Sequence, residues 1–314
     1  MTWLAAIAIA VAVAISPDVA RGFAAGSTWF IDPDSNAARA EARMRALGNT
    51  DDAEAFHVLA TASQADWFGG WSGPIRAAVA QRLSQIEAQQ ALPVFVAYNV
   101  PGRDCSGYSS GGANTADEYR DWIDDFASAL GEQRAVVILE PDSLALTECL
   151  PPDRLAERYA LINAALQRLV QQPGVAVYLD GGHSAWHAAD DQAARLTRAG
   201  VGGAQGFFLN VSNFQRTDDE LAYGSALSGL VSWKHFVIDT SRNGNGPWQS
   251  AEPETWCNPP GRALGPGPTL ATGQPLADAF LWIKRPGEND GSCRSGPAAG
   301  AWYPEYALAL VRNR

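Results

Sequence analysis

Residues 94–112 read VFVAYNVPGRDCSGYSSGG and join a buried strand to a glycine-rich loop. The first five residues are apolar, β-branched or aromatic, which is typical of a strand covered on both faces. Pro101 and Gly102 end the strand, and a loop with Arg103 and Asp104 follows. Such a junction is typical of an active-site rim, although an ordinary strand-to-helix turn with an Arg–Asp ion pair fits the same residues.

The alternation of strand and helix continues along the chain. Strands are expected at residues 64–68, 93–98, 135–139, 175–179, 206–210, 235–238 and 279–283. Helices are expected at residues 36–47, 72–90, 116–130, 152–171, 187–199, 217–230 and 303–312. This pattern indicates an α/β fold with a parallel sheet, and seven strands suit a closed or nearly closed β/α barrel. An open doubly wound sheet is the alternative, but no GxGxxG follows the first strand, which weakens its nucleotide-binding form.

Composition and charge limit the classes of function. The chain has 314 residues, of which 46% are hydrophobic, and its formal net charge is −11. A β/α barrel of this length is commonly one domain, and no linker or internal repeat divides the sequence. An acidic chain without a basic run is not suited to bind nucleic acid or an anionic membrane surface. Nothing in the sequence implies a protein partner.

An apolar segment, LAAIAIAVAVAI, occupies residues 4–15. It is short for a bilayer-spanning helix and resembles the hydrophobic region of a secretory signal, although Arg21 is the first basic residue. We therefore expect residues 1–25 to be a signal peptide or apolar leader and residues 26–314 to be a single catalytic domain. The protein is expected to be secreted, with retention by an uncleaved N-terminal segment as the alternative.

Four cysteines support export. Their number is even, and they show no CxxC or Cys/His spacing of a metal site. Of three possible pairings, Cys105–Cys149 and Cys257–Cys293 are favoured because each would close a single loop region. In the chain-entropy model each such loop is worth roughly 4 kcal/mol. Four reduced, buried thiols are the alternative.

Polar and acidic residues follow nearly every predicted strand. They are Tyr98, Arg103 and Asp104 after the second strand, Glu140, Asp142 and Ser143 after the third, Asp180 and His183 after the fourth, Asn210 and Asn213 after the fifth, Asp239, Arg242 and Asn243 after the sixth, and Lys284, Glu288 and Asp290 after the seventh. In a β/α barrel the carboxyl ends of the strands share the catalytic face. An isolated Asp there is usually a helix cap, but this many acids exceed what capping requires. Their mutual repulsion should raise at least one pKa, as a general acid requires.

Two reaction classes use such a cluster of carboxylates. Glycoside hydrolysis needs a protonated acid and a second carboxylate, and Mg²⁺- or Mn²⁺-assisted chemistry needs carboxylates as ligands. Trp67, Trp186 and Trp256 lie near strand ends or loop motifs, where flat rings can stack on pyranose rings. Packing at the rim is the alternative for each, but together they favour a sugar substrate.

Seven motifs resemble those of glycoside hydrolase family 6, the family of inverting β-1,4-glucanases. In order they are YNVPGRDC, ILEPDS, YLDGGHSAW, LNVSN, VIDTSRNGNGP, WCNPPGRALG and LWIKRPGENDG, and the resemblance runs from about Trp29 to the C-terminus. It implies a distorted seven-stranded parallel β/α barrel of the TIM-like kind. It also implies both disulfides as paired above.

The resemblance implies roles for individual residues. Asp142 in EPDS would donate the proton to the leaving glycosidic oxygen, and Asp104 in GRDC would raise the pKa of that acid and relay a proton through water. Tyr98 would press on the sugar ring, Ser110 would help to hold the water, and Asp290 matches the position often proposed as general base. The substrate-binding residues would be Asp180, His183, Asn210, Lys284 and Glu288 for hydroxyls, Arg262 as the partner of a site carboxylate, and Trp67, Trp186 and Trp256 as stacking platforms.

Three positions depart from the commonest pattern of the family. Gly181 stands where Ala is usual, Phe214 where Tyr often occurs, and Arg285 in place of a frequent Pro. None of them removes a functional group from the proposed chemistry, and Arg285 could alter a product-side subsite.

The loop lengths predict the mode of action. In cellobiohydrolases of the family, a long insertion roofs the cleft, whereas here only two residues separate Asp290 from Cys293. We therefore predict an open active-site cleft and a secreted endo-β-1,4-glucanase that acts with inversion and without a cofactor. The alternatives are an exo-acting cellobiohydrolase, a non-catalytic β-glucan-binding protein and a metal-dependent carbohydrate enzyme.

Overall fold

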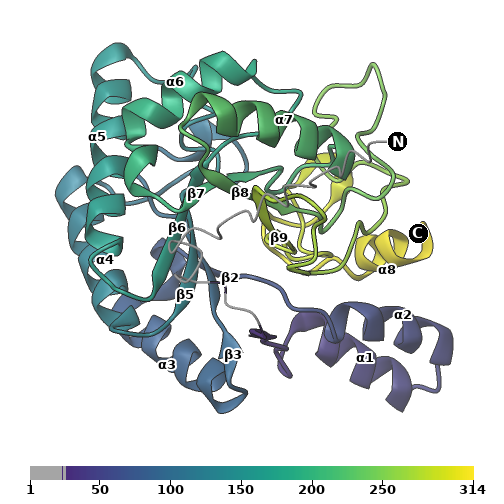
Figure 1. Ribbon diagram of the computed structural model, residues 1–314. Helices are drawn as coiled ribbons and strands as arrows, with labels where there is room; N and C mark the ends of the chain where they lie inside the picture. The colour runs from purple at the N-terminus through teal and green to yellow at the C-terminus, as the bar shows by residue number, and fades with distance from the viewer. Residues whose placement is uncertain (1–22, 24–25) are drawn as a thin grey trace, which may run out of the picture.

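The computed structural model describes Phe23 and residues 26–314, so the predicted leader at residues 1–25 lies outside it apart from Phe23. Seven strands form one parallel sheet in the order β2-β4-β5-β6-β7-β8-β9. The strands are β2 (Asp66–Phe68), β4 (Val94–Ala97), β5 (Ala135–Leu139), β6 (Val175–Asp180), β7 (Gly206–Leu209), β8 (His235–Asp239) and β9 (Ala277–Leu281). The sheet curves into a distorted barrel (Figure 1), which confirms the predicted fold class.

Isolated contacts, rather than a ladder, close the barrel between β2 and β9. The Ala65 amide donates to the Trp282 carbonyl at 3.0 Å, and the indole Nε1 of Trp67 donates to the Ile283 carbonyl at 2.8 Å. Arg285 donates its Nε to the carbonyl of Ala65 at 2.9 Å. The sheet is therefore a barrel with a seam, intermediate between a closed barrel and an open sheet.

Alternate residues of each strand pack on opposite sides of the sheet. In β4, Val94 and Val96 pack inside the barrel with Ile138 of β5, whereas Phe95 packs against the surrounding helices with Val137. Both faces are covered, so the strands appear in the sequence as continuous hydrophobic runs.

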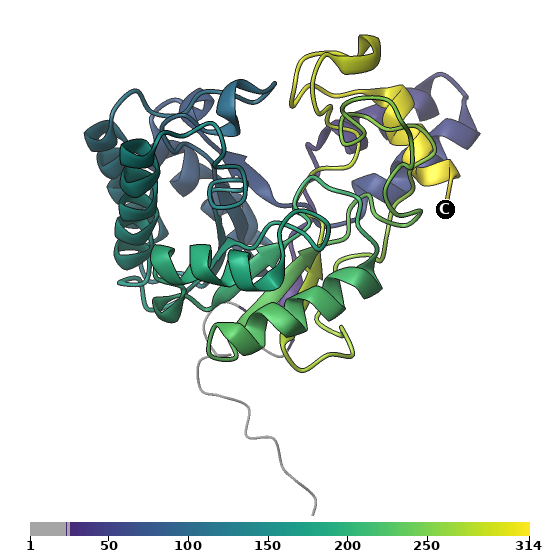
Figure 2. The same ribbon diagram turned by 90° about the horizontal axis from the view of Figure 1, so that it is seen from above.

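The helices lie outside the sheet. They are α1 (Asn36–Ala46), α2 (Thr50–Ala60), α3 (Ile75–Ala88), α4 (Ala116–Leu130), α5 (Pro152–Leu169), α6 (Ala189–Ala199), α7 (Thr217–Leu230) and α8 (Pro304–Arg312). Helices α3 to α7 surround the sheet, and α1, α2 and α8 gather beside β9 (Figures 1 and 2). A further two-stranded sheet pairs β1 (Thr28–Trp29) with β3 (Ala91–Leu92). Within the described residues, no helix is long and apolar enough to cross a membrane.

Helix α2 was not predicted. Its N-cap is Asn49, whose side chain accepts a hydrogen bond from the Asp52 amide at 3.2 Å, and Asp51 adds a second acid to the first turn. The signal was present, because an Asn cap followed by acids is typical of a helix start. Gly48, at φ +74°, was correctly expected to follow the end of α1.

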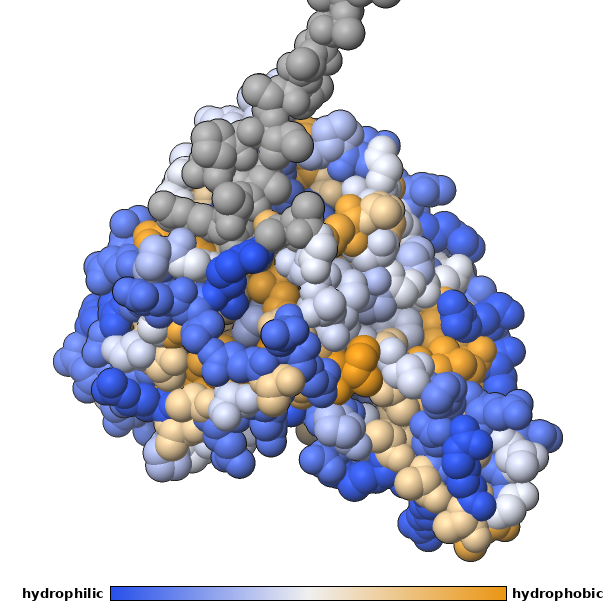
Figure 3. All heavy atoms as spheres, turned by 60° about the horizontal axis from the view of Figure 1, so that its bottom comes forward, coloured by the Kyte–Doolittle hydropathy of each residue, from blue (hydrophilic) through white to orange (hydrophobic). Residues whose placement is uncertain are grey.

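Both predicted disulfides are present, and each joins two loops that leave neighbouring parts of the sheet. Cys105–Cys149 ties the loop after β4 to the loop after β5, and Cys257–Cys293 ties the loop after β8 to the loop after β9. The loops at this end of the barrel face one another in the view from above (Figure 2). The face seen in Figure 3 is mainly hydrophilic, with hydrophobic residues in small groups.

Candidate active site

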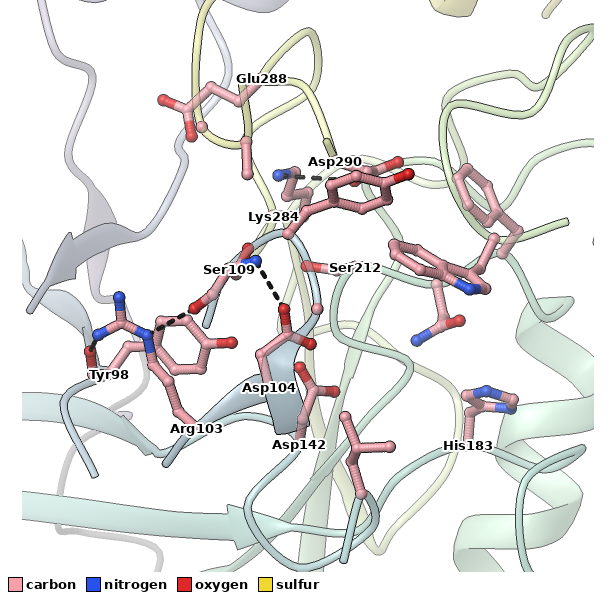
Figure 4. Close-up of a pocket in the computed structure, with 18 of the residues that line it drawn as sticks. Tyr98, Arg103, Asp104, Ser109, Asp142, His183, Ser212, Lys284, Glu288 and Asp290 are labelled. Atoms are coloured by element: carbon pink, nitrogen blue, oxygen red, sulfur yellow. Dashed lines mark hydrogen bonds and ion pairs between the residues drawn. The ribbon is translucent and has the colours of Figure 1, made fainter. Parts of the chain in front are cut away.

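A cleft of about 1090 Å³ lies among the loops that follow the strands. Its lining includes the predicted catalytic residues Tyr98, Asp104, Ser110, Asp142 and Asp290, and the predicted binding residues Trp67, His183, Trp186, Trp256, Lys284 and Glu288. Figure 4 shows how several of these side chains converge from different loops. The structure thus brings most of the predicted site together in one place.

Asp142 is a carboxyl with little to stabilise its charge. No hydrogen bond to its side-chain oxygens is found within residues 26–314 of the described chain, and its backbone is left-handed at φ +68°. Burial raises the pKa of Asp142 well above its usual range, and the carboxylates of Asp180 and Asp104 raise it further, whereas Lys284 acts to lower it. A raised pKa lets a carboxyl hold its proton at higher pH than a free aspartate does, which suits a general acid.

Asp104, on the loop after β4, lies near Asp142, which follows β5 (Figure 4). Its Oδ2 accepts a hydrogen bond from the Ser109 amide at 2.6 Å, and the loop passes through left-handed backbone from Asp104 to Ser106. Burial raises the pKa of Asp104, against the opposing effects of the Ser109 amide and Arg103. Ser110 lies exposed at the rim of the same loop, where it lines the cleft.

An aromatic cluster covers the start of this loop. The guanidinium of Arg103 lies 4.7 Å from the ring centroid of Tyr98 and 4.9 Å from that of Trp71. Trp67 meets the Tyr98 ring edge-on at 5.3 Å. Trp71 lines the cleft and is 57% exposed, but the sequence analysis missed it. Its place just after the end of β2 was the signal that could have found it.

Asp290, on the opposite wall, is surrounded by donors. Arg242 donates its Nη1 to both carboxylate oxygens at 2.8 Å, and the Asn258 amide donates to Oδ2 at 3.0 Å. The Nζ of Lys284 lies 3.6 Å from Oδ1. Burial lowers the pKa of Lys284, although Asp290 acts to raise it. The side chains of Arg242, Lys284 and Asp290 form one buried ion-pair group on this wall, and the Asn258 backbone amide adds a further donor.

The expected role of Arg262 as partner of a site carboxylate is wrong. Arg262 donates to the backbone carbonyls of Pro260, Asn245 and Gly246 and lies outside the cleft lining. Arg242 makes the ion pair that was expected of Arg262. The sequence places both arginines after β8, and only the path of the loop decides which one reaches the carboxylate.

Asp180 and Asn210 are not placed to bind substrate hydroxyls, which corrects the prediction for both. Neither lines the cleft. The carboxylate of Asp180 is buried and accepts the amides of Leu144 and Ala145 at 2.9 and 2.8 Å and that of Gly182 at 3.0 Å. Its charge acts on the site indirectly, through the pKa of Asp142.

Asn210 is fully buried and holds its own loop together. Its Nδ2 donates to the carbonyls of Asp239 and Gln215 at 2.9 and 3.2 Å, and its Oδ1 accepts the Gln215 amide at 3.0 Å. These bonds set the course of residues 212–215, which line the cleft. Asn210 thus shapes the cleft wall without facing it.

Trp186 lies between two histidines. Its ring centroid is 5.2 Å from that of His183 and 5.9 Å from that of His187. Burial lowers the pKa of His183 to about 4, with His187 acting in the same direction, so this ring is neutral at ordinary pH. His183 and Trp186, which line the cleft, thus present an uncharged aromatic surface on which a sugar ring can stack.

The two walls approach each other at Tyr108, which the sequence analysis did not single out. Its hydroxyl donates to Glu254 at 3.3 Å, and its ring centroid is 6.1 Å from that of Trp256. Gly291 faces the ring so closely that a Cβ there would lie 2.2 Å from Tyr108 Cγ. No long insertion follows Asp290, as expected, but one side chain narrows the cleft.

Comparison with known proteins identifies the family. The model of the glycosyl hydrolases family 6 matches residues 24–314. Endoglucanase 1 of Streptomyces halstedii is 40% identical over 99% of this chain and 97% of its own length. The solved structure of the endoglucanase Cel6 from Mycobacterium tuberculosis, in complex with a methyl-cellobiosyl-4-deoxy-4-thio-β-D-cellobioside, superposes with a TM-score of 0.87 at 46% identity, covering 92% of this chain and 98% of that one.

Cellobiohydrolases are more distant. A probable 1,4-β-D-glucan cellobiohydrolase C of Neosartorya fischeri is 32% identical over 70% of this chain and 61% of its own length. The fold, the acid cluster in an aromatic cleft and the match over nearly the whole sequence all agree. The chain belongs to the glycosyl hydrolases family 6.

Proposed function

We propose that this protein is an endo-β-1,4-glucanase that hydrolyses internal β-1,4-glucosidic bonds of cellulose or a soluble β-glucan with inversion of configuration. The observation that carries the proposal is Asp142: a carboxyl of raised pKa, without a hydrogen-bond partner in the described chain, in a cleft walled by Trp67, Trp186 and Trp256. The endoglucanase names of the relatives with higher identity support the choice over exo action.

In the proposed reaction, Asp142 transfers its proton to the glycosidic oxygen as the C1–O bond breaks. A water held near Ser110 attacks C1 from the opposite face and gives up a proton to a base. Tyr98 contacts the ring at the cleavage point. Asp290 is the predicted base, and Asp104 acting through water is the alternative. The donors around Asp290 occupy its lone pairs, which favours Asp104.

Residues 26–314 are proposed to act as a single catalytic domain, and export is proposed for the protein as a whole. Two disulfides support an oxidising compartment, since they are rare in the cytosol. The predicted signal peptide and the alternative of an uncleaved anchor both concern residues outside the described part of the chain.

The test of endo action follows the viscosity and the reducing ends of a soluble cellulose derivative together. Cleavage of internal bonds should lower viscosity steeply while few reducing ends appear. A slow, proportional fall with cellobiose as the sole early product would establish the cellobiohydrolase alternative instead. Absence of any hydrolysis would favour the glucan-binding alternative, and loss of activity in EDTA would favour the metal-dependent one.

The stereochemical test uses NMR of the first product. An inverting enzyme releases the α-anomer from a β-linked substrate, because a single displacement by water forms no covalent intermediate. An initial β-anomer would mean retention and would contradict the proposed mechanism.

A further inference from the structure

We propose that Glu140 and Arg158 are positioning residues that fix the acid Asp142 relative to the loop that carries Tyr98 and Asp104. Neither residue lines the cleft. The inference rests on the proposed hydrolysis and adds to it the means by which two separate strand ends are held in one catalytic geometry.

Glu140 joins the end of β5 to the end of β4. Its side chain is 0% exposed, and both of its carboxylate oxygens lie 2.9 Å from the Asn99 amide. Oε2 also accepts the Val100 amide at 3.0 Å. Asn99 directly follows Tyr98, and Glu140 lies two residues before Asp142. The carboxylate therefore ties the backbone of the ring-contacting tyrosine to the backbone of the acid.

Arg158, on α5, holds the same two loops by their carbonyls. Its Nη2 donates to Pro101 and Gly102 at 2.8 and 3.0 Å, and its Nη1 donates to Ser143 at 3.2 Å. Gly102 leads directly into the Arg103-Asp104 segment. Glu140 thus takes the amides and Arg158 the carbonyls of the segments that flank both catalytic carboxyls.

The left-handed backbone at Glu140 and Asp142, φ +54° and +68°, makes this fixation necessary. Non-glycine residues persist in that region only where their surroundings determine the conformation. The planar guanidinium of Arg158 reaches both loops at once through two separate nitrogens, whereas a lysine has a single nitrogen at the end of its side chain. We therefore expect the position of the acid, rather than the shape of the binding cleft, to depend on this pair.

Glu220 on α7 provides a matched control within the chain. It is also a fully buried glutamate that accepts the amide of a cleft loop, that of Ser184 at 2.8 Å. Burial raises the pKa of both glutamates to about 7. Glu220, however, supports the loop of His183 and Trp186, the binding wall, and not the acid.

The test compares Glu140→Gln with Glu220→Gln on cellohexaose. Glutamine keeps one acceptor but turns an NH₂ group toward the donors, so each loop should move while the fold remains. For Glu140→Gln, kcat should fall by about 10–100-fold with KM within about twofold, since a misplacement near 1 Å can lose 10² in rate. For Glu220→Gln, KM should rise by about fivefold and kcat should change less than KM.

The pH profile supplies a readout that a general loss of stability does not move. The basic limb of kcat reports the pKa of the acid in the complex. Asp142 faces the carboxylates of Asp180 and Asp104 and the ammonium of Lys284. If Glu140→Gln lets the Asp104 loop move away, this limb should shift to lower pH, and Arg158→Lys, which keeps the charge, should shift it in the same direction.

The outcomes are distinguishable. A wild-type enzyme that does not cleave cellohexaose contradicts the proposed function, whatever the variants do. An active wild type with Glu140→Gln folded by circular dichroism, unchanged in kcat and in the basic limb, overturns the positioning role alone. If Glu140→Gln does not fold, Arg158→Lys decides the question by the same two measurements: a loss confined to kcat supports the role, and an unchanged kcat contradicts it.

Discussion

Two aspartates on opposite walls of the cleft differ in almost every feature of their surroundings. Asp142, after β5, has neighbouring carboxylates, and no hydrogen bond to its side chain is found in the described residues. Asp290, after β9, is bonded to Arg242 and Asn258 and lies near Lys284. The same side chain thus has a raised pKa on one wall and is held in an ion pair on the other. The neighbouring groups, rather than the residue type, decide the role of each carboxyl group.

The largest effect is expected from Asp142→Asn, which keeps the shape but cannot donate a proton. Proton donation is typically worth 10²–10⁴-fold, or about 3–5 kcal/mol in the barrier. Cellulose should be hydrolysed more slowly by that factor, because its leaving group is a sugar alcohol. An aryl cellobioside with a strongly acidic phenol needs little help and should lose much less. Initial rates on the two substrates, with the variant shown to be folded, make the measurement.

Equal losses on both substrates for Asp142→Asn would remove Asp142 from the acid role. They would point to Asp104, the other carboxyl of raised pKa in the cleft. The contrast between the two walls would then lie between Asp104 and Asp290.

Asp290→Asn should give a smaller loss, of about 10–100-fold, that is the same on both substrates. Each substrate needs an activated water and an intact cleft wall, whatever its leaving group. The variant also leaves Arg242 buried without its counter-charge, and breaking a buried pair in this way typically destabilises by about 3–5 kcal/mol. Rates on both substrates and thermal unfolding together check the expectation.

The control for Asp290→Asn is the double variant with Arg242→Met. Removing both charges should recover part of the stability, because the charge of Arg242 no longer stays buried without its partner, although Lys284 still loses its contact with Asp290. It should not recover activity. Recovery of activity in the double variant would show that Asp290 serves only to neutralise Arg242 and would exclude it as the base.

Sequence could predict the strands and which loops meet, but not the direction in which polar side chains turn. Asp180 and Asn210 follow strands as the catalytic residues do, yet both turn inward to satisfy backbone groups. Arg242 and Arg262 lie on the same loop region. Arg262 donates to the carbonyl of Asn245 instead of to a carboxylate. Position after a strand is readable from sequence, whereas the unpaired backbone groups near it exist only in the folded chain.

The position of Tyr108 shows the same limit. Its segment contains only small and polar neighbours, and nothing in the sequence connects it with Gly291. The contact arises because two disulfide-tied loops from distant strands converge over the cleft.

Tyr108→Ala should remove the side chain at which the two walls of the cleft approach each other. Losing the contacts with Glu254 and Gly291 widens the cleft without touching either carboxyl group. We expect KM on the soluble polymer to change by about two- to fivefold, with the same anomer produced and a steeper fall in viscosity per reducing end. A shift toward cellobiose as the main early product would contradict the idea that Tyr108 narrows the cleft.

The smallest expected effect is on the pH dependence of stability. Its sign follows from buried glutamates whose pKa is raised. Burial raises the pKa of Glu140 and of Glu220 to about 7, above the ordinary value of 4.5 in the unfolded chain. The folded state therefore binds protons that the unfolded state releases, so the stabilisation is complete below about pH 4.5 and is lost as pH rises through 7. Each group contributes at most about 1.4 kcal/mol per pH unit in that window.

Asp32 is an example of the opposite sign: burial acts to raise its pKa, but Arg82 and the Asp34 amide hold it below the ordinary value of 3.8. Its contribution is lost only as pH falls below that range, so it does not offset the glutamates between pH 5 and 8. The melting temperature should therefore be several degrees higher at pH 5 than at pH 8. In Glu220→Gln this difference should shrink, because glutamine does not titrate. An unchanged difference in that variant would mean that other buried carboxyls, Asp142 and Asp180 first among them, carry the pH dependence.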